Sequence, residues 1–192
     1  NILHAGYGHP LLRAWHGERA LLHPSQLVLP LFIHDQPDTL QPIPGLPDTW
    51  HIGLHRLRDY LAPLVAKGLR AVLLFGVPTT ATKDAAGSPA DDAAGPVVQA
   101  TRLLRAEFPD LFVICDVCLC AYTSHGHCGL LHPTGRIDNP ASTARLAQVA
   151  LAYAEAGAHM VAPSDMMDNR VGAIKAALHQ AGRTDVAVMS YA

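Results

Sequence analysis

Apolar runs of strand length alternate with segments of helical periodicity along most of the chain. Unbroken apolar runs are typical of strands buried on both faces of a parallel sheet, whereas apolar residues at every third or fourth position indicate helices that pack on it. The runs that predict strands are residues 26–33, 70–77, 111–117, 159–163 and 186–191. The segments that predict the intervening helices are residues 54–65, 96–104, 139–153 and 174–178.

Proline and glycine mark several boundaries of these elements. Asn139-Pro140 predicts a helix N-cap followed by a proline in the first turn. Gly68 and Gly157 follow helical segments and predict their C-terminal ends. Pro30 lies inside the first predicted strand, where it removes one backbone donor. It weakens that strand prediction without overturning it.

Four strand–helix pairs followed by one more strand predict an α/β fold with right-handed parallel crossovers. A whole (β/α)8 barrel needs roughly 250 residues, so on that interpretation the chain holds about five of eight strands and is expected to be truncated. A five-stranded flavodoxin-like open sheet is the alternative. We divide the chain into an N-terminal arm, residues 1–25, and an incomplete TIM-barrel domain, residues 26–192. Residues 35–50 and 79–95 are predicted loops.

The arm contains a short predicted helix at residues 9–15. Its apolar residues need another surface to cover them, and a neighbouring subunit is one candidate.

Composition narrows the class of protein. Of 192 residues, 49% are hydrophobic and 16% are charged, which argues against disorder, and the net charge of -2 argues against a nucleic-acid binder. The sequence has no apolar run near the ~18 residues that a membrane span requires. The first residues have no basic segment followed by an apolar core, so we expect no signal peptide and a cytoplasmic protein.

All four cysteines lie between Cys115 and Cys128. A disulfide framework would spread them along the chain, so the cluster favours metal ligands or reactive thiols. Asp116, Cys118 and Cys120 share the parity of the third predicted strand and should point to the same side.

The loop that follows contains Gly126 and can bring Cys128 back as a third ligand. Three thiolates with an open coordination position are typical of a catalytic zinc site. Cys115 has the opposite parity and is interpreted as a core residue. His125 and His127 fit a ligand, a proton shuttle or a polar loop residue equally well.

The segment 116–129, DVCLCAYTSHGHCG, resembles the zinc signature of the porphobilinogen synthase (5-aminolevulinate dehydratase) family. Further matching segments lie at Tyr7 with residues 9–13, and at residues 75–78, 162–168 with Arg170, and 189–191. Ala121 and Asn169 depart from the family pattern, in which a proline and a glycine are common at these two positions.

The resemblance implies the condensation of two 5-aminolevulinate molecules to porphobilinogen, a dehydration in haem and tetrapyrrole biosynthesis. Family members are (β/α)8 barrels that usually form octamers, with an N-terminal arm that wraps a neighbouring subunit. The residues implicated by matching position are Cys118, Cys120 and Cys128 as zinc ligands, Asp116 and Ser164 in the substrate site, and His127 at a second metal site.

The same resemblance places the two Schiff-base lysines, the arginines that grip the substrate and the other ligand of the second metal site beyond Ala192. The chain's own lysines are Lys67, Lys83 and Lys175, and their positions in helices and a loop predict a surface location. We therefore expect the 192-residue chain to lack synthase activity on its own.

Two other functions compete with the enzyme. One is a non-catalytic, zinc-binding truncated product that co-assembles with full-length subunits. The other is an unrelated α/β protein with redox-active cysteines, which would favour a C-x-x-C pair. Cys115 and Cys118 have that spacing, but strand parity puts them on opposite faces of the sheet.

Overall fold

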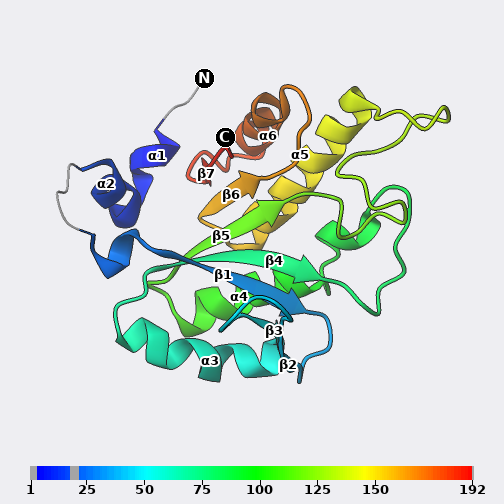
Figure 1. Ribbon diagram of the computed structural model, residues 1–192. Helices are drawn as coiled ribbons and strands as arrows, with labels where there is room; N and C mark the ends of the chain where they lie inside the picture. The colour runs from blue at the N-terminus through cyan, green and yellow to red at the C-terminus, as the bar shows by residue number, and fades with distance from the viewer. Residues whose placement is uncertain (1–3, 18–21, 192) are drawn as a thin grey trace.

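A computed structural model describes residues 4–17 and 22–191 of the chain. A single sheet forms its centre, with the strands in the order β2-β3-β1-β4-β5-β6-β7 (Figure 1). Five of these strands are parallel neighbours in chain order, as the apolar runs predicted: β1 (Val28–His34), β4 (Ala71–Val77), β5 (Phe112–Val117), β6 (Met160–Pro163) and β7 (Ala187–Val188). The last of them is shorter than the apolar run at residues 186–191 suggested.

Four helices connect these strands and pack side by side, each against the next (Figure 1). They are α3 (Leu54–Ala66), α4 (Pro96–Glu107), α5 (Asn139–Ala156) and α6 (Arg170–Gln180). Because every crossover adds the next strand on the same side with the same hand, the helices cover one face of the sheet. A flavodoxin-like sheet reverses its strand order at a switch point. The order found here has no reversal among the parallel strands that the helices connect.

The helix ends follow the expected chemistry with one correction. The N-cap of α5 is Asp138, whose carboxylate accepts the Ala141 N–H at 3.1 Å, so Asn139 and Pro140 are the first two helical residues. Gly157 ends α5 with a φ of 110°, and Gly68 adopts a φ of 104° after α3. Both glycines supply the left-handed conformation that a helix C-terminus favours.

The loop predicted at residues 35–50 is partly wrong. Its residues include β2 (Leu40–Pro42), which pairs antiparallel with β3 (Trp50–Gly53). β3 in turn pairs in parallel with residues 32–34 of β1, and within residues 4–17 and 22–191 no strand pairs with β1 at Pro30 on that side. A missing N–H costs little at such an edge, which explains why β1 continues through Pro30.

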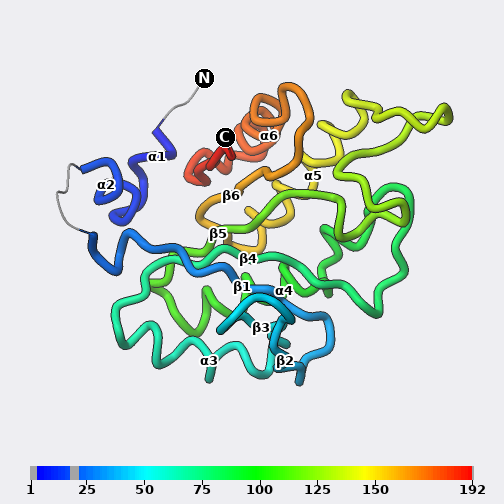
Figure 2. Tube along the Cα trace, viewed as in Figure 1, coloured from blue at the N-terminus to red at the C-terminus, as the bar shows by residue number. Residues whose placement is uncertain are grey.

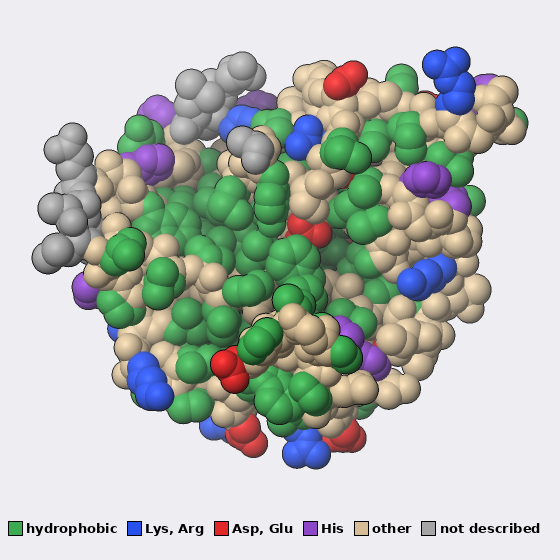
Figure 3. Space-filling view, in the orientation of Figure 1, with side chains coloured by type: hydrophobic (Ala, Val, Ile, Leu, Met, Phe, Trp, Pro, Cys, Tyr) green, Lys and Arg blue, Asp and Glu red, His purple; other side chains and the backbone are tan. Residues whose placement is uncertain are grey.

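The two faces of the sheet are covered differently. The helices bury one face in a large apolar core, whereas the opposite, inner face carries a smaller cluster that includes Leu73, Phe112 and Ile114. In Figure 3, hydrophobic side chains gather in the hollowed centre of the visible face of the molecule. An open sheet of this kind leaves part of its apolar inner surface accessible.

The N-terminal arm packs on this inner face of its own chain. Its helices are α1 (Ala5–Gly8) and α2 (Pro10–His16), followed by the short 3-10 helix η1 (Pro24–Gln26). α1 lies beside β7 (Figure 2), and Leu12 is buried in the inner cluster. The Phe112 ring stacks on His159 and meets Trp15 edge-on. The predicted helix at residues 9–15 is therefore confirmed, and the sheet supplies the surface that covers it.

None of the helices within residues 4–17 and 22–191 combines the length and apolar character needed to cross a membrane.

Candidate metal centre

Three of the four cysteines meet just beyond the C-terminal end of β5. The sulfur atoms of Cys118, Cys120 and Cys128 all lie within 4.8 Å of one another. The Cys118 thiol donates to the Cys120 sulfur at 3.5 Å. Cys118 is buried, Cys128 is half-buried and Cys120 is exposed. The predicted convergence of these thiols is therefore found, and one side of the group faces solvent.

The fourth cysteine is separate from this group. Cys115 is fully buried in the core between the sheet and the helices, and its sulfur lies 3.3 Å from the Thr101 hydroxyl of α4. Burial raises the pKa of Cys115 to about 12. A thiol held this way is a packing residue, as its strand parity predicted, and it forms no C-x-x-C redox pair with Cys118.

The thiols share protons rather than titrating independently. The hydrogen bond from Cys118 lowers the pKa of Cys120 to about 6, whereas donating that bond raises the pKa of Cys118. Burial raises the pKa of Cys128. A cation bound by these sulfurs would favour the loss of their protons.

Asp116 and Ser164 lie next to the thiols, at the ends of β5 and β6. Burial raises the pKa of Asp116 to about 6, although a hydrogen bond from the Ser164 side chain acts in the opposite direction. The Oδ1 atom of Asp116 is buried and has no hydrogen-bond partner in the described part of the chain. A carboxyl group with this pKa can hold or release a proton near neutral pH.

The two histidines of the loop stand apart from the three sulfurs. The His125 and His127 rings lie 5.4 Å apart, and the His127 N–H donates to His125 Nδ1 at 3.1 Å. His127 is exposed. Within residues 4–17 and 22–191, no second group of three potential metal ligands comes together. The role of His127 at a second metal site stays a prediction.

The lysines lie largely where the sequence suggested. Lys67 follows α3 and Lys83 lies in the loop after β4, and both are exposed, whereas Lys175 is half-buried on α6.

A brace that the sequence did not reveal supports the thiol loop from the side. Residues 84–91 include the short 3-10 helix η2 (Ser88–Asp91), inside the segment predicted as a loop. The Asp84 carbonyl accepts the Ser124 N–H at 2.8 Å. Arg145 of α5 donates to both carboxylate oxygens of Asp91, at 2.5 and 2.6 Å. No spacing rule links residues so distant in the chain, so only an alignment of homologues would have provided a signal.

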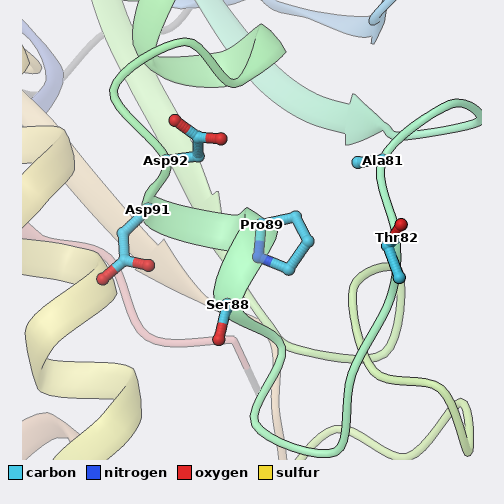
Figure 4. Close-up of a pocket in the computed structure, with 6 residues that line it drawn as sticks. All are labelled: Ala81, Thr82, Ser88, Pro89, Asp91 and Asp92. Atoms are coloured by element: carbon cyan, nitrogen blue, oxygen red, sulfur yellow. The ribbon is translucent and has the colours of Figure 1, made fainter.

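An open depression lies between η2 and the loop after β4 (Figure 4). Its lining residues are Ala81, Thr82, Ser88, Pro89, Asp91 and Asp92. Figure 4 shows the Asp91 side chain directed toward the neighbouring helix, where Arg145 pairs with it. No thiol or imidazole lines this depression, so it is separate from the three cysteines.

The donor set fits a zinc ion. A zinc–sulfur bond of about 2.3 Å in tetrahedral geometry places sulfur atoms about 3.8 Å apart. The observed separations, 3.5 Å for one pair and within 4.8 Å for all, bracket that value. Three soft ligands favour zinc over magnesium or calcium and leave a fourth position for another ligand.

Comparison with known proteins assigns the family. The family model described as "Delta-aminolevulinic acid dehydratase" matches residues 3–192. The chain belongs to the delta-aminolevulinic acid dehydratase family. Curated dehydratases from Eremothecium gossypii and Pongo abelii are 57% and 54% identical to it over its whole length. A bacterial dehydratase from Halalkalibacterium halodurans is 45% identical over 89% of the chain.

A solved dehydratase structure has the same fold. The delta-aminolevulinic acid dehydratase (porphobilinogen synthase) of Toxoplasma gondii, in complex with the reaction product porphobilinogen, superposes with a TM-score of 0.85 at 33% identity. The match covers 98% of this chain and 53% of that protein. The fold is therefore that of a TIM-barrel enzyme family. The chain spans about half the length of the curated dehydratases it matches, 57% for the Eremothecium relative.

One departure from the family pattern has a structural explanation. Asn169, at a position where glycine is frequent, is the N-cap of α6 and adopts a left-handed φ of 62°. Asparagine is among the few residues other than glycine that tolerate this conformation.

Proposed function

We propose that this chain is the metal-binding part of a porphobilinogen synthase, which condenses two 5-aminolevulinate molecules to porphobilinogen in haem and tetrapyrrole biosynthesis. The observation that carries the proposal is the convergence of Cys118, Cys120 and Cys128 beyond β5, in a chain that belongs to the dehydratase family. The Toxoplasma relative, whose structure contains porphobilinogen, supports the choice of reaction.

The three thiols would hold a zinc ion. When bound, zinc supplies a Lewis acid that polarises a substrate oxygen. The chain's own contribution is positional, since β5 and its loop fix the sulfurs at the carboxyl end of the sheet, where barrel enzymes have their active sites. The exposed side of Cys120 leaves room for a substrate group to approach.

Asp116 and Ser164 would handle protons and orientation beside this ion. The carboxyl group of Asp116, at the end of β5 beside the thiols, would accept a proton from a substrate and return it. Its unpaired, buried Oδ1 atom is available to a substrate donor. Ser164 lies beside β5, since its backbone N–H donates to the Val117 carbonyl at 3.3 Å, and its hydroxyl would orient the carboxyl group.

The zinc content of the purified chain tests this proposal. We expect about one zinc ion per chain, and single changes of Cys118, Cys120 and Cys128 to serine should each lower the zinc content sharply. Cys115→Ala is the matched control, because this thiol lies outside the group, and it should retain zinc. Full zinc retention in the three serine variants would contradict the proposal.

A porphobilinogen assay tests the catalytic part separately. We expect no product from the 192-residue chain with added zinc, because its three lysines do not match the family's Schiff-base positions. Clear turnover would refute that expectation.

We also propose that the protein forms homo-oligomers through the arm. In support, Tyr7, Leu22 and Leu27 expose large apolar surfaces in or next to the arm. Light scattering after size exclusion should give a mass above that of the 20.5 kDa chain, and a monomer at all concentrations would refute the proposal.

A further inference from the structure

The loop that carries the thiols is anchored by a buried aromatic residue. Between Cys118 and Cys128 the chain makes a tight turn, in which the N–H groups of Tyr122 and Thr123 both donate to the Leu119 carbonyl at 2.9 Å. The Tyr122 side chain leaves this turn and enters the core, where it is 4% exposed. A loop residue in such a place fixes the turn to the sheet and the helices.

The Tyr122 ring packs closely against the backbone of β4. A β-carbon at Gly76 would overlap the Tyr122 hydroxyl and would come within 3.0 Å of Tyr122 Cζ and of a methyl group of Val97. The Tyr122 ring therefore lies directly against the backbone of β4, beside the first turn of α4. Only glycine at position 76 leaves this space open.

A second buried tyrosine lies in the same core cluster as Tyr122. This residue, Tyr153, is fully buried on α5 and donates to the Ala90 carbonyl at 2.8 Å. Tyr122 thus connects the thiol loop with β4 and the start of α4, and Tyr153 connects α5 with the segment that braces the loop. Because Tyr122 is buried against the β4 backbone, its side chain cannot shift without moving the turn.

We propose that Tyr122 is a positioning residue: by packing against Gly76 it fixes the turn, and the turn sets the spacing of the three sulfurs. This inference rests on the zinc site proposed above. Cys120 precedes the tyrosine by two residues, so a displaced turn moves the Cys120 sulfur relative to Cys118, which follows β5 directly. Residues that hold metal ligands in place typically contribute about 10- to 100-fold to metal affinity.

Cobalt binding measures this effect without relying on catalysis. Co²⁺ bound by thiolates gives a sulfur-to-metal absorption band whose position and intensity report the coordination geometry. We expect Tyr122→Ala to weaken Co²⁺ and Zn²⁺ binding by about 10- to 100-fold and to alter this band. Tyr122→Phe keeps the ring and should retain the parent spectrum.

Two further variants separate positioning from general loss of stability. Leu104→Ala creates a cavity in the same core, away from the loop, and should lower the melting temperature while leaving metal affinity and spectrum unchanged. Gly76→Ala should disturb the band as Tyr122→Ala does, and adding Tyr122→Phe should restore part of it, because the overlapping oxygen is removed. Should Tyr122→Ala fail to fold, Tyr122→Leu replaces it.

The outcomes distinguish the two proposals. If the parent chain shows no sulfur-to-cobalt band, the zinc proposal fails and this inference fails with it. If the parent shows the band and Tyr122→Ala retains the parent affinity and spectrum, only the positioning role of Tyr122 is overturned.

Discussion

The pair formed by Arg145 and Asp91 gives the sharpest stability prediction. Only 12% of the Arg145 side chain and 26% of the Asp91 side chain are exposed. Besides its two bonds to the carboxylate, Arg145 donates to the Ala86 and Gly87 carbonyls at 3.1 and 3.2 Å. Arg145→Met keeps most of the apolar stem but removes all four of these hydrogen bonds.

The expected loss follows from the burial of the pair. Removing one partner of a buried ion pair costs about 3–5 kcal/mol, whereas exposed pairs contribute about 0–1 kcal/mol. Since Asp91 is about one-quarter exposed, we expect Arg145→Met to lower the free energy of unfolding by about 2–4 kcal/mol. Arg58 and Glu107 form a matched, exposed pair, with 69% and 40% exposure, so Arg58→Met should cost less than about 1 kcal/mol.

Urea unfolding followed by circular dichroism measures both changes. A double-mutant cycle with Asp91→Asn isolates the coupling between the two side chains, which should exceed about 1 kcal/mol. If Arg145→Met cost no more than Arg58→Met, the brace would not stabilise the fold and this reasoning would be wrong.

The pH dependence of stability and the cost of replacing glycines that have a positive φ are also testable. Burial, with the nearby charges of Arg105 and His9, lowers the pKa of His159 to about 4. Between about pH 6.5 and 4 the unfolded chain therefore binds a proton that the folded chain does not, so stability falls as the pH falls. With a discount for the partial exposure of His159, the free energy of unfolding should fall by roughly 1 kcal/mol from pH 7 to pH 5. Urea unfolding should show a smaller fall for His159→Gln than for the parent protein. Equal falls would refute this reasoning. Gly157→Ala should lower the free energy of unfolding by about 1–2 kcal/mol, because Gly157 has a φ of 110° and the Arg105 stem would lie 3.1 Å from the new carbon. Gly182→Ala should lower it less in the same urea measurement, because Gly182 has a φ of 72° but lies in open space. The reverse order would contradict the steric argument.

The sequence predicted the parts of the molecule that local patterns determine. Five apolar runs became parallel strands because such runs can be buried on both faces. The spacing of Cys118 and Cys120 also predicted that their sulfurs would meet, although both lie just beyond the last residue of β5, Val117. The order of the local patterns and the residue types were therefore enough to predict the helix-connected sheet and the candidate metal ligands.

Tertiary contacts determine what the sequence did not predict. β2 and β3 are short, and the proline-rich segment that contains them gives no periodic signal; they exist because β1 offers them an edge. The contact of Tyr122 with Gly76 and the ion pair of Arg145 with Asp91 join residues far apart in the chain. Such pairs leave no mark in hydrophobic periodicity, so a single sequence cannot identify them.

The chain-order pairing of β1, β4, β5, β6 and β7 has a consequence for how the protein folds. Each new strand docks on the strand–helix unit made just before it, so assembly can follow the direction of synthesis with small costs in loop-closure entropy. All three thiols come from one loop between β5 and α5. The metal-binding loop can therefore take its final shape during translation, once β4, α4 and α5 are in place.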